Sequence, residues 1–413
     1  MLKNIGFPKH LIRRAKNRAI REAVNRLDAP PRYFDYQYLR LQNPKEHLTR
    51  LQAQGVASSC EYQCLEPAGW SRGPLPMNIS SRDELSKTTH HGAFEFPFSF
   101  YDVPERKTTE SHVITIPDCR IVSSSDQWGA EFYAIVNRDD RLLAVRGTSF
   151  TAAHAQTLRS VGSPERIKKA SWILEIWSQN YLHWLVYHLP KILLLRSCGL
   201  ADQIIIPESN NSLDLIESSL EFLGVTPSNL PRLRTSLLQV DELSVVGVDY
   251  FPSSLLRRVR SQIVGPDTAT PIRKIFISRE HAERRRLENE NEVWIILQAA
   301  GFERVALERL SFREQITLMS ETAVLFGPSG AGLGNMLFCP PRAQIIEISD
   351  PDYPSPDFYA LANSLGHHYW LLHSERLCSG KPGYRNLVVD PSAVRSVIGR
   401  IESAATASAL EGD

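Results

Sequence analysis

A glycine-rich turn in the carboxy-terminal half of the chain has residue types that bind phosphate groups. The turn, GPSGAGLGN over residues 327–335, follows the predicted strand Ala323–Phe326 and opens the predicted helix Gly332–Phe338. Glycine lets a backbone approach a ligand closely, and the first turn of a helix offers unpaired N–H groups and a partial positive charge. The candidate ligand-binding residues within the turn are Ser329, Gly330, Ala331, Gly332 and Leu333. A tight strand-to-helix turn without a ligand is the alternative.

A serine and an arginine follow a second predicted strand. Ser278 and Arg279 come directly after Lys274–Ile277, at the end where open α/β sheets bind ligands. The planar guanidinium of Arg279 can hold a diphosphate and stabilise the charge that develops as it leaves. Three further arginines at residues 284–286 add positive charge, and we interpret most of it as a solvated face.

Two other polar side chains in this half are candidates for ligand binding. Glu347 stands near the carboxyl end of the predicted strand Gln344–Ile348, where it would accept hydrogen bonds from ribose hydroxyls; an exposed carboxylate without a ligand is the alternative. Ser311 and Glu314 have the spacing of a capping box, which favours a structural role for both. Gln315 has no part in that box, so we expect it to face the ligand.

The amino-terminal half offers a candidate base. Asn180 is the predicted N-cap of a helix over Tyr181–Arg196, which places His183 in the first turn. Because a helix N-terminus disfavours a charged imidazolium, His183 would be neutral and able to accept a proton. Tyr187 lies one turn later on the same face, and His188 is the second candidate base. A structural histidine that fixes the helix is the alternative for His183.

Strands and helices alternate around these residues, which predicts how they are positioned. The other predicted strands are Trp172–Trp177, Ile204–Pro207 and Arg304–Leu307, and the other predicted helices are Ser212–Leu223, Glu288–Ala300 and Phe312–Ser320. Such alternation is typical of a mostly parallel sheet covered on both faces.

Other segments differ from this pattern. Three β-rich runs separated by polar turns predict a small antiparallel β element, at Val113–Ile116, Phe132–Val136 and Leu142–Val145. Residues 28–110 are interrupted by Pro, Ser and Gly and are predicted to be an irregular lead-in, while residues 259–271 are the predicted linker.

Length and charge restrict the class of protein. A chain of 413 residues exceeds the size at which one core stops growing, so we expect two domains with a cleft between them. The formal net charge of +1 provides no basic field that would attract nucleic acid. Residues 1–26, however, carry eight Lys or Arg against one Glu, a net +7 on a predicted helix with a thin apolar stripe. This segment either lies on an anionic membrane surface or is a solvated helix.

The sequence also indicates a location and argues against a metal site. No apolar stretch approaches the roughly 20 residues that span a bilayer, and no secretory signal is recognisable. We therefore expect a cytoplasmic protein, with peripheral contact at the inner membrane through residues 1–26. The six cysteines are scattered, without a paired spacing or a neighbouring His cluster, so no metal site is predicted.

Several of these motifs, in this order, resemble glycosyltransferase family 61, the capsular polysaccharide and plant xylosyl- or arabinosyltransferase group. The resemblance runs from about Ile116 to Ile348. Its matching stretches are Asn180–Val186 with Leu189–Lys191, Ile275–Arg279 with Arg285–Glu290, Gly301-Phe302, Leu310–Gln315, and Gly327–Phe338 followed by Pro340-Pro341.

The resemblance implies a fold and a reaction. It implies an α/β protein of GT-B type, with two Rossmann-like domains facing across a cleft and the small β element in the amino-terminal half. The expected division is a lead-in over residues 1–110, an acceptor-side domain over 111–262 and a nucleotide-sugar-binding domain over 263–413. The implied reaction is an inverting sugar transfer without an obligatory metal or other cofactor. Its partners would be a nucleotide-diphosphate sugar and a glycan or lipid-linked glycan hydroxyl, in surface polysaccharide or capsule biosynthesis.

Two departures from the family pattern leave alternatives open. Tyr187 stands where the family usually has an acidic residue, and Ser329 stands where it has a His within the glycine turn. If that acid is the family's base, tyrosine is a poor replacement at neutral pH. The alternatives are a sugar-binding or scaffolding subunit of a polysaccharide assembly complex and, on weaker grounds, a serine hydrolase that uses Ser329.

Overall fold

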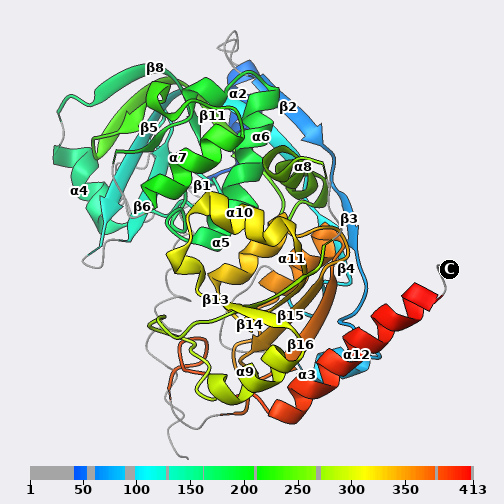
Figure 1. The fold of residues 1–413 in the computed structure, drawn as a ribbon. Coiled ribbons are helices and arrows are strands. Elements are labelled where there is room, and N and C mark those ends of the chain that lie inside the picture. The colour runs from blue at the N-terminus through cyan, green and yellow to red at the C-terminus, as the bar shows by residue number, and fades with distance from the viewer. Residues whose placement is uncertain are drawn as a thin grey trace, which may run out of the picture.

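Two β-sheets organise the protein, one in each half of the chain (Figure 1). The structure is a computed structural model that describes residues 41–53, 61–88, 98–126, 130–160, 162–208, 212–266, 271–376 and 380–410. Residues 1–26, with the predicted membrane contact, lie outside this part of the chain. None of the helices within it combines the length and the apolar composition needed to cross a bilayer.

The first sheet is built around two long strands, β5 (Ser111–Ser125) and β11 (Leu237–Gly247). Its strand order is β1-β7-β6-β5-β11-β8, with β2 also paired to β5. The remaining strands are β1 (Leu41–Gln42), β2 (Glu61–Glu66), β6 (Glu131–Val136), β7 (Leu142–Leu143) and β8 (Glu165–Trp172). Two short two-stranded sheets lie outside it, β3 (Gly69–Arg72) with β4 (Glu105–Thr108) and β9 (Ile206–Pro207) with β10 (Arg232–Leu233).

The prediction of a mostly parallel sheet in the amino-terminal half is wrong. β5 pairs antiparallel with β2, β6 and β11, and among the described strands of this sheet the parallel pairs are β8 with β11 and β1 with β7. The predicted antiparallel β element is present and forms the body of this sheet. In the apolar run Trp172–Trp177, which was predicted to be a strand, strand β8 ends at Trp172. Residues 173–175 form a buried loop after it. A short apolar run has no periodicity that separates a paired strand from a buried loop.

Helices of the amino-terminal half pack on this sheet and on one another. The predicted helix Tyr181–Arg196 begins as α5 (Tyr181–His183), continues through a π-helical turn, η4 (Trp184–His188), and ends as α6 (Leu189–Ser197). α6 packs against β5, β11 and α8. The other helices of this half are α2 (Pro44–Ala53), α3 (Arg82–Thr88), α4 (Ala152–Ser160), η5 (Ala201–Gln203), α7 (Leu213–Phe222), η6 (Pro227–Asn229) and α8 (Ser253–Val264).

The predicted linker is wrong over residues 259–264, which belong to α8. Leu255, Leu256, Val259 and Ile263 are buried at helical spacing. This apolar stripe packs on helices of both halves of the chain, so the segment is ordered by its contacts rather than free to link domains. The helix ends at Gly265, whose φ of +81° is accessible to glycine at little cost.

The second sheet is entirely parallel, as the alternation predicts. Its order is β13-β12-β14-β15-β16. The strands are β12 (Arg273–Ile277), β13 (Phe302–Val305), β14 (Thr322–Pro328), β15 (Gln344–Ser349) and β16 (His368–His373). The helices are α9 (Glu290–Ala299), η7 (Leu307–Arg309), α10 (Phe312–Ser320), η8 (Ala331–Phe338), α11 (Asp357–Leu365) and α12 (Pro391–Leu410). The capping box of Ser311 and Glu314 at the start of α10 is confirmed.

The two halves are in direct contact, and the fold is a mixed α/β structure with a parallel sheet. One cluster of buried apolar side chains includes residues of both sheets, and α5 and α8 pack against η8. A segment from the lead-in also pairs with the edge strand β16, since the N–H of Met77 donates to the carbonyl of Tyr369 and the amide of Asn78 bonds with the backbone of Leu371. Figure 1 shows this chain running down one side of both sheets. The domain boundaries and the GT-B arrangement remain predictions.

Candidate active site

A pocket of about 540 Å³ is lined by both halves of the chain. Lining residues from the amino-terminal half include Arg146, Glu175, Trp177, Asn180, His183, Tyr187 and Tyr250. Those from the carboxy-terminal half include Arg284, Arg285, Ser329, Ala331, Tyr353, Asp357 and Tyr384. A ligand in this pocket would therefore contact segments from both halves of the chain.

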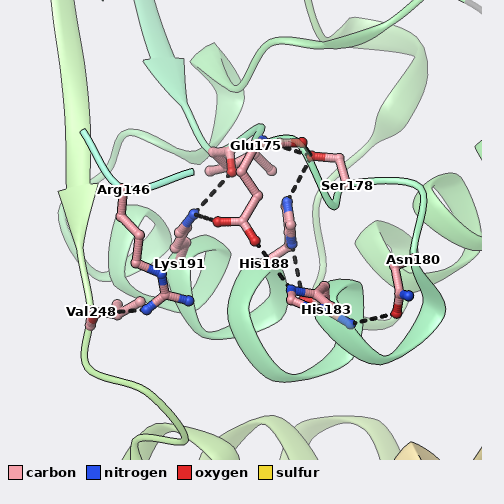
Figure 2. A network of polar contacts seen from close by, with 9 residues as sticks. Arg146, Glu175, Ser178, Asn180, His183, His188, Lys191 and Val248 are labelled. Atoms are coloured by element: carbon pink, nitrogen blue, oxygen red, sulfur yellow. Dashed lines mark hydrogen bonds and ion pairs between the residues drawn. The ribbon is translucent and has the colours of Figure 1, made fainter. Parts of the chain in front are cut away.

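His183 is held in the pocket wall by its helix and by an aromatic neighbour. Asn180 is the N-cap of α5, as predicted, and its side chain accepts a hydrogen bond from the backbone N–H of His183 at 3.3 Å. The imidazole stacks on Trp177, with ring centroids 5.6 Å apart. Its Nδ1 atom lies 3.5 Å from Oε1 of Glu175 (Figure 2). One face of the ring is thus fixed by protein while the side chain keeps about a quarter of its surface exposed.

Glu175 is a buried carboxylate that the sequence analysis missed. Its side chain is 3% exposed, and its other oxygen, Oε2, lies 3.3 Å from Nζ of Lys191. Burial alone would raise the pKa of Glu175, but the ammonium of Lys191 and the neighbouring imidazole of His183 hold it well below its usual range. In the sequence, Glu175 is the lone charged residue of the apolar run Trp172–Trp177, and this lone charge is the signal that could have identified it.

Lys191 balances the charge of this carboxylate. Its ammonium is buried and also donates to the backbone carbonyl of Ile173 at 3.1 Å. Burial lowers the pKa of Lys191, and Glu175 opposes that shift. The carboxylate therefore stays ionised beside His183, where it can orient the ring and stabilise an imidazolium.

His188, the second candidate base, lies away from the pocket. Its side chain is fully buried, stacks on Trp184 at 4.7 Å, and bonds with the Ser178 hydroxyl and the backbone carbonyl of His183. Burial lowers the pKa of His188 to about 3. Because it does not line the pocket, it acts on the turn that carries His183 rather than on a ligand.

Tyr187 lines the pocket, but as part of an aromatic cage. The guanidinium of Arg146 lies 4.1 Å from the centre of the Tyr187 ring and 4.0 Å from that of Tyr250. Burial raises the pKa of Tyr187 well above its usual range, which removes it further from the role of a base at neutral pH. Tyr187 is thus a neutral part of the pocket wall, and its predicted role in ligand binding stays a prediction.

The glycine-rich turn lies at the pocket through Ser329 and Ala331, but its glycines serve protein packing. A Cβ atom at Gly330 would stand 2.3 Å from Nη1 of Arg279, and one at Gly334 would stand 2.9 Å from the Leu182 side chain. The close approach that these glycines allow is therefore that of Arg279 and Leu182. Leu333 is buried at 1% exposure and is not among the lining residues.

Arg279 lies beside the turn, as predicted, and its hydrogen bonds go to the chain itself. Its guanidinium donates to the backbone carbonyls of Arg285 at 3.2 Å and Arg284 at 2.9 Å. Burial lowers the pKa of Arg279 to about 10, which leaves it charged at neutral pH. Residues 284 and 285, interpreted from sequence as a solvated face, line the pocket instead.

Three predicted ligand-binding side chains are engaged inside the protein, which corrects those predictions. The hydroxyl of Ser278 donates to Glu290 at 2.6 Å, and Ser278 is 3% exposed. The amide of Gln315 donates to two backbone carbonyls and accepts from the Tyr181 hydroxyl. Glu347 is fully buried, because β15 lies between two strands of the sheet, and it accepts a hydrogen bond from Tyr369 at 2.6 Å.

A second carboxylate in the pocket was also missed. Asp357 begins α11 and faces the lining residues of the other half. Burial raises its pKa, while the charge of His183 opposes that shift. No group of three or more His, Cys, Asp and Glu side chains in the described part of the chain could hold a metal ion. The absence of an obligatory metal remains a prediction.

The pocket brings His183, the buried Glu175 and several arginines together around one space. The family model described as Glycosyltransferase 61 matches residues 181–346, so this region of the chain is similar to that family. It contains His183, Arg279, Arg285 and the glycine-rich turn. The resemblance stated from the motifs is thus confirmed.

One curated relative adds a named activity. The chain is 34% identical over 108 residues to an EGF domain-specific O-linked N-acetylglucosamine transferase of Drosophila melanogaster. The match covers 25% of this chain and 20% of the relative, so it spans about a fifth of that protein's length.

Proposed function

We propose that this chain is a glycosyltransferase that moves a sugar from a nucleotide-diphosphate donor to an acceptor hydroxyl. The observation that carries the proposal is the pair formed by His183 and the buried, ionised Glu175 in the wall of a pocket that also exposes arginines. A base held by a carboxylate on one side and cations for a leaving diphosphate on the other are the two requirements of such a transfer. The family match over residues 181–346 supports the same class of reaction.

The reaction proceeds by direct displacement with inversion at the anomeric carbon. The acceptor oxygen forms a bond to that carbon while the bond from the carbon to the diphosphate oxygen breaks. With Nδ1 directed at Glu175, Nε2 of His183 takes the acceptor proton and the imidazolium is stabilised by the carboxylate. The departing diphosphate carries the electron pair, and the arginines at the pocket stabilise its charge, so that no metal is required.

Donor and acceptor occupy different sides of the pocket in this proposal. The acceptor lies over Trp177 and His183, on the amino-terminal side, and the donor lies over Arg285, Ser329 and Ala331. The acceptor is a glycan or lipid-linked glycan of a surface polysaccharide such as a capsule. The relative's name instead points to a protein acceptor, so acceptor panels should include both kinds. The proposed location is the cytoplasm, with residues 1–26 at the inner membrane.

A sugar-binding scaffold is the second candidate, because Tyr187 replaces the family's usual acid. Glu175 weakens this alternative, since it places an ionised carboxylate beside the same histidine. A serine hydrolase has less support, because no described contact joins Ser329 to a histidine; Ser329 interacts instead with the buried carboxyl of Glu347.

A product assay tests the proposal. The full chain is screened with nucleotide sugars and glycan, lipid-linked and polypeptide acceptors, and transfer is followed in a single turnover. His183→Ala should lower the rate by about 10²- to 10⁴-fold, the typical contribution of a general base. His368→Ala, on β16 and outside the pocket, is the matched control and should retain the rate. Donor binding without turnover across all acceptors would favour the scaffold.

The membrane contact is tested separately. A chain without residues 1–26 should lose co-sedimentation with anionic liposomes and keep transfer to a soluble acceptor. Equal sedimentation of both chains would show that this segment is not the contact.

A further inference from the structure

We infer that Arg285, and not Arg279, is the guanidinium that contacts the phosphates of the donor, and that Arg279 acts by holding Arg285 in place. The inference rests on the proposed function, because it assigns the donor side of the same pocket. Of these two arginines of one motif, Arg285 binds the ligand and Arg279 positions Arg285.

Arg285 is a charged side chain without a protein counter-ion in the described contacts. It lines the pocket, and its Nε atom is buried with no hydrogen-bond partner among the described residues. Among the described residues no carboxylate forms an ion pair with Arg285, and burial lowers its pKa. A desolvated guanidinium is costly unless an anion or hydrogen-bond acceptor compensates it. A diphosphate in the pocket would supply both.

The backbone at Arg285 is also strained. Its φ is +56°, a left-handed conformation that a side chain with a Cβ adopts at a cost of about 1 kcal/mol or more. Residues in such conformations persist where the surrounding structure holds them, and they concentrate at ligand sites. This strain is consistent with a side chain that must be held in one direction to contact a ligand.

Arg279 provides the contacts that hold this backbone. Its Nε and Nη2 atoms donate to the carbonyls of Arg285 and Arg284, at 3.2 and 2.9 Å, and its Nη1 side lies against Gly330. These bonds use the directions in which the guanidinium would otherwise meet a phosphate. Arg279 is not among the residues that line the pocket. Its position between the glycine-rich turn and the arginine loop fits a brace.

The loop is braced from its other end as well. The N–H of Leu387 donates to the carbonyl of Arg286, and the N–H of Glu288 donates to the carbonyl of Leu387. This second segment carries Tyr384, whose ring lies 4.7 Å from the guanidinium of Arg284. The donor side of the pocket is thus a pair of connected loops, with Arg285 directed into the space between them.

The acids near Arg285 do not neutralise it as an ion pair would. Glu347 contributes an attraction to Arg285, but burial raises the pKa of Glu347 to about 7, so this carboxyl is not fully ionised at neutral pH. The other groups that act on Arg285 are the phenols of Tyr353 and Tyr384 and the like charge of Arg284. The local field is therefore positive and suited to a polyanion.

The test compares nucleoside diphosphates with monophosphates in calorimetry on the full chain. Uridine and guanosine diphosphates and their monophosphates serve as probes, and the wild type should bind at least one diphosphate more tightly than its monophosphate. Arg285→Gln should weaken diphosphate binding roughly 10- to 100-fold, the range of a charge-assisted contact, and change monophosphate binding little. Arg285→Lys should weaken diphosphate binding less than Arg285→Gln does, because lysine keeps the positive charge but loses the forked hydrogen-bonding geometry of the guanidinium. Arg286→Gln, exposed and outside the pocket lining, is the matched control.

A double-mutant cycle separates contact from positioning. Arg279→Gln should weaken diphosphate binding in the wild type and have almost no further effect in Arg285→Gln, since a brace matters only while the braced group is present. Additive losses, or an Arg285→Gln variant that keeps the preference for diphosphate, would overturn the inference while leaving sugar transfer intact. If the wild type binds no nucleoside diphosphate, the proposed function and the inference both fail.

Discussion

Gly147 lies against Glu175 so closely that a Cβ atom on Gly147 would stand 2.2 Å from the Cβ of Glu175 and 2.7 Å from its Oε2. Gly147 also has a φ of +75°, where a side chain is disfavoured. The space beside Gly147 is therefore what admits the buried carboxylate that faces His183. The orientation of the proposed base His183 therefore depends on Gly147 through Glu175.

Gly147→Ala should lower both stability and transfer, because the methyl group displaces Glu175 from His183. We expect a loss of about 2 kcal/mol or more in the free energy of unfolding, from steric overlap and backbone strain together. Urea unfolding and single-turnover rates measure the two effects. Gly199→Ala is the matched control, since Gly199 has a φ of +70° but open space around its Cβ position. Equal losses in both variants would mean that strain alone, and not the contact with Glu175, is responsible.

Glu175→Gln should reduce kcat by about 10²-fold and also destabilise the protein, because Lys191 is left buried without a counter-charge. The double variant Glu175→Gln with Lys191→Met removes that charge and should recover most of the stability. If the carboxylate acts on His183, the double variant will still have the low kcat of the single one. Recovery of kcat together with stability would assign Glu175 a purely structural role.

Trp177→Ala should raise the acceptor KM roughly 10-fold, or about 1.4 kcal/mol, and leave the donor KM nearly unchanged. The indole is 54% exposed at the pocket and stacked on His183, so its free face offers an apolar surface to an acceptor. Initial rates with the acceptor found in the panel measure the effect, and Trp177→Phe should be intermediate. Trp70→Ala removes a tryptophan that is 56% exposed on β3, outside the pocket, and should have no effect.

The stability of the protein should depend on pH through Glu347. Burial raises the pKa of Glu347 to about 7, from an ordinary value of 4.5. Below this ordinary pKa the carboxyl is protonated in both the folded and the unfolded protein. As the pH rises towards 7, the unfolded protein loses the proton first, so the free energy of unfolding falls. Over that window the loss is about 3 kcal/mol at 1.36 kcal/mol per pKa unit.

Comparison with Glu347→Gln isolates this dependence from the other titrating groups. The variant cannot ionise, so the difference in unfolding free energy between it and the wild type should change by about 3 kcal/mol between about pH 4.5 and about pH 7.5. Urea titrations at several pH values measure it. A difference that stays constant with pH would show that Glu347 ionises at its ordinary value and is not buried as described.

The parallel sheet of the carboxy-terminal half was predictable, and the mixed sheet of the other half was less so. β12, β14 and β15 are short apolar runs bounded by helices with clear start signals, such as the capping box of Ser311 and Glu314. In the amino-terminal half, the partners of β5 come from segments before and after it, up to more than a hundred residues apart. Local patterns carry no information on such pairings.

The candidate site likewise has features that were predictable from local sequence and features that were not. Local sequence patterns were enough to predict the N-cap at Asn180, the place of His183 in the first helical turn, and the strand-to-helix position of the glycine-rich turn, because each depends on a few neighbouring residues. Three other features became visible once the chain was folded: Glu175 faces His183, His188 is buried, and Arg285 rather than Arg279 lines the pocket. The environment of a charged side chain is set by atoms from distant segments, and it is this environment that fixes whether the charge meets solvent, protein or ligand.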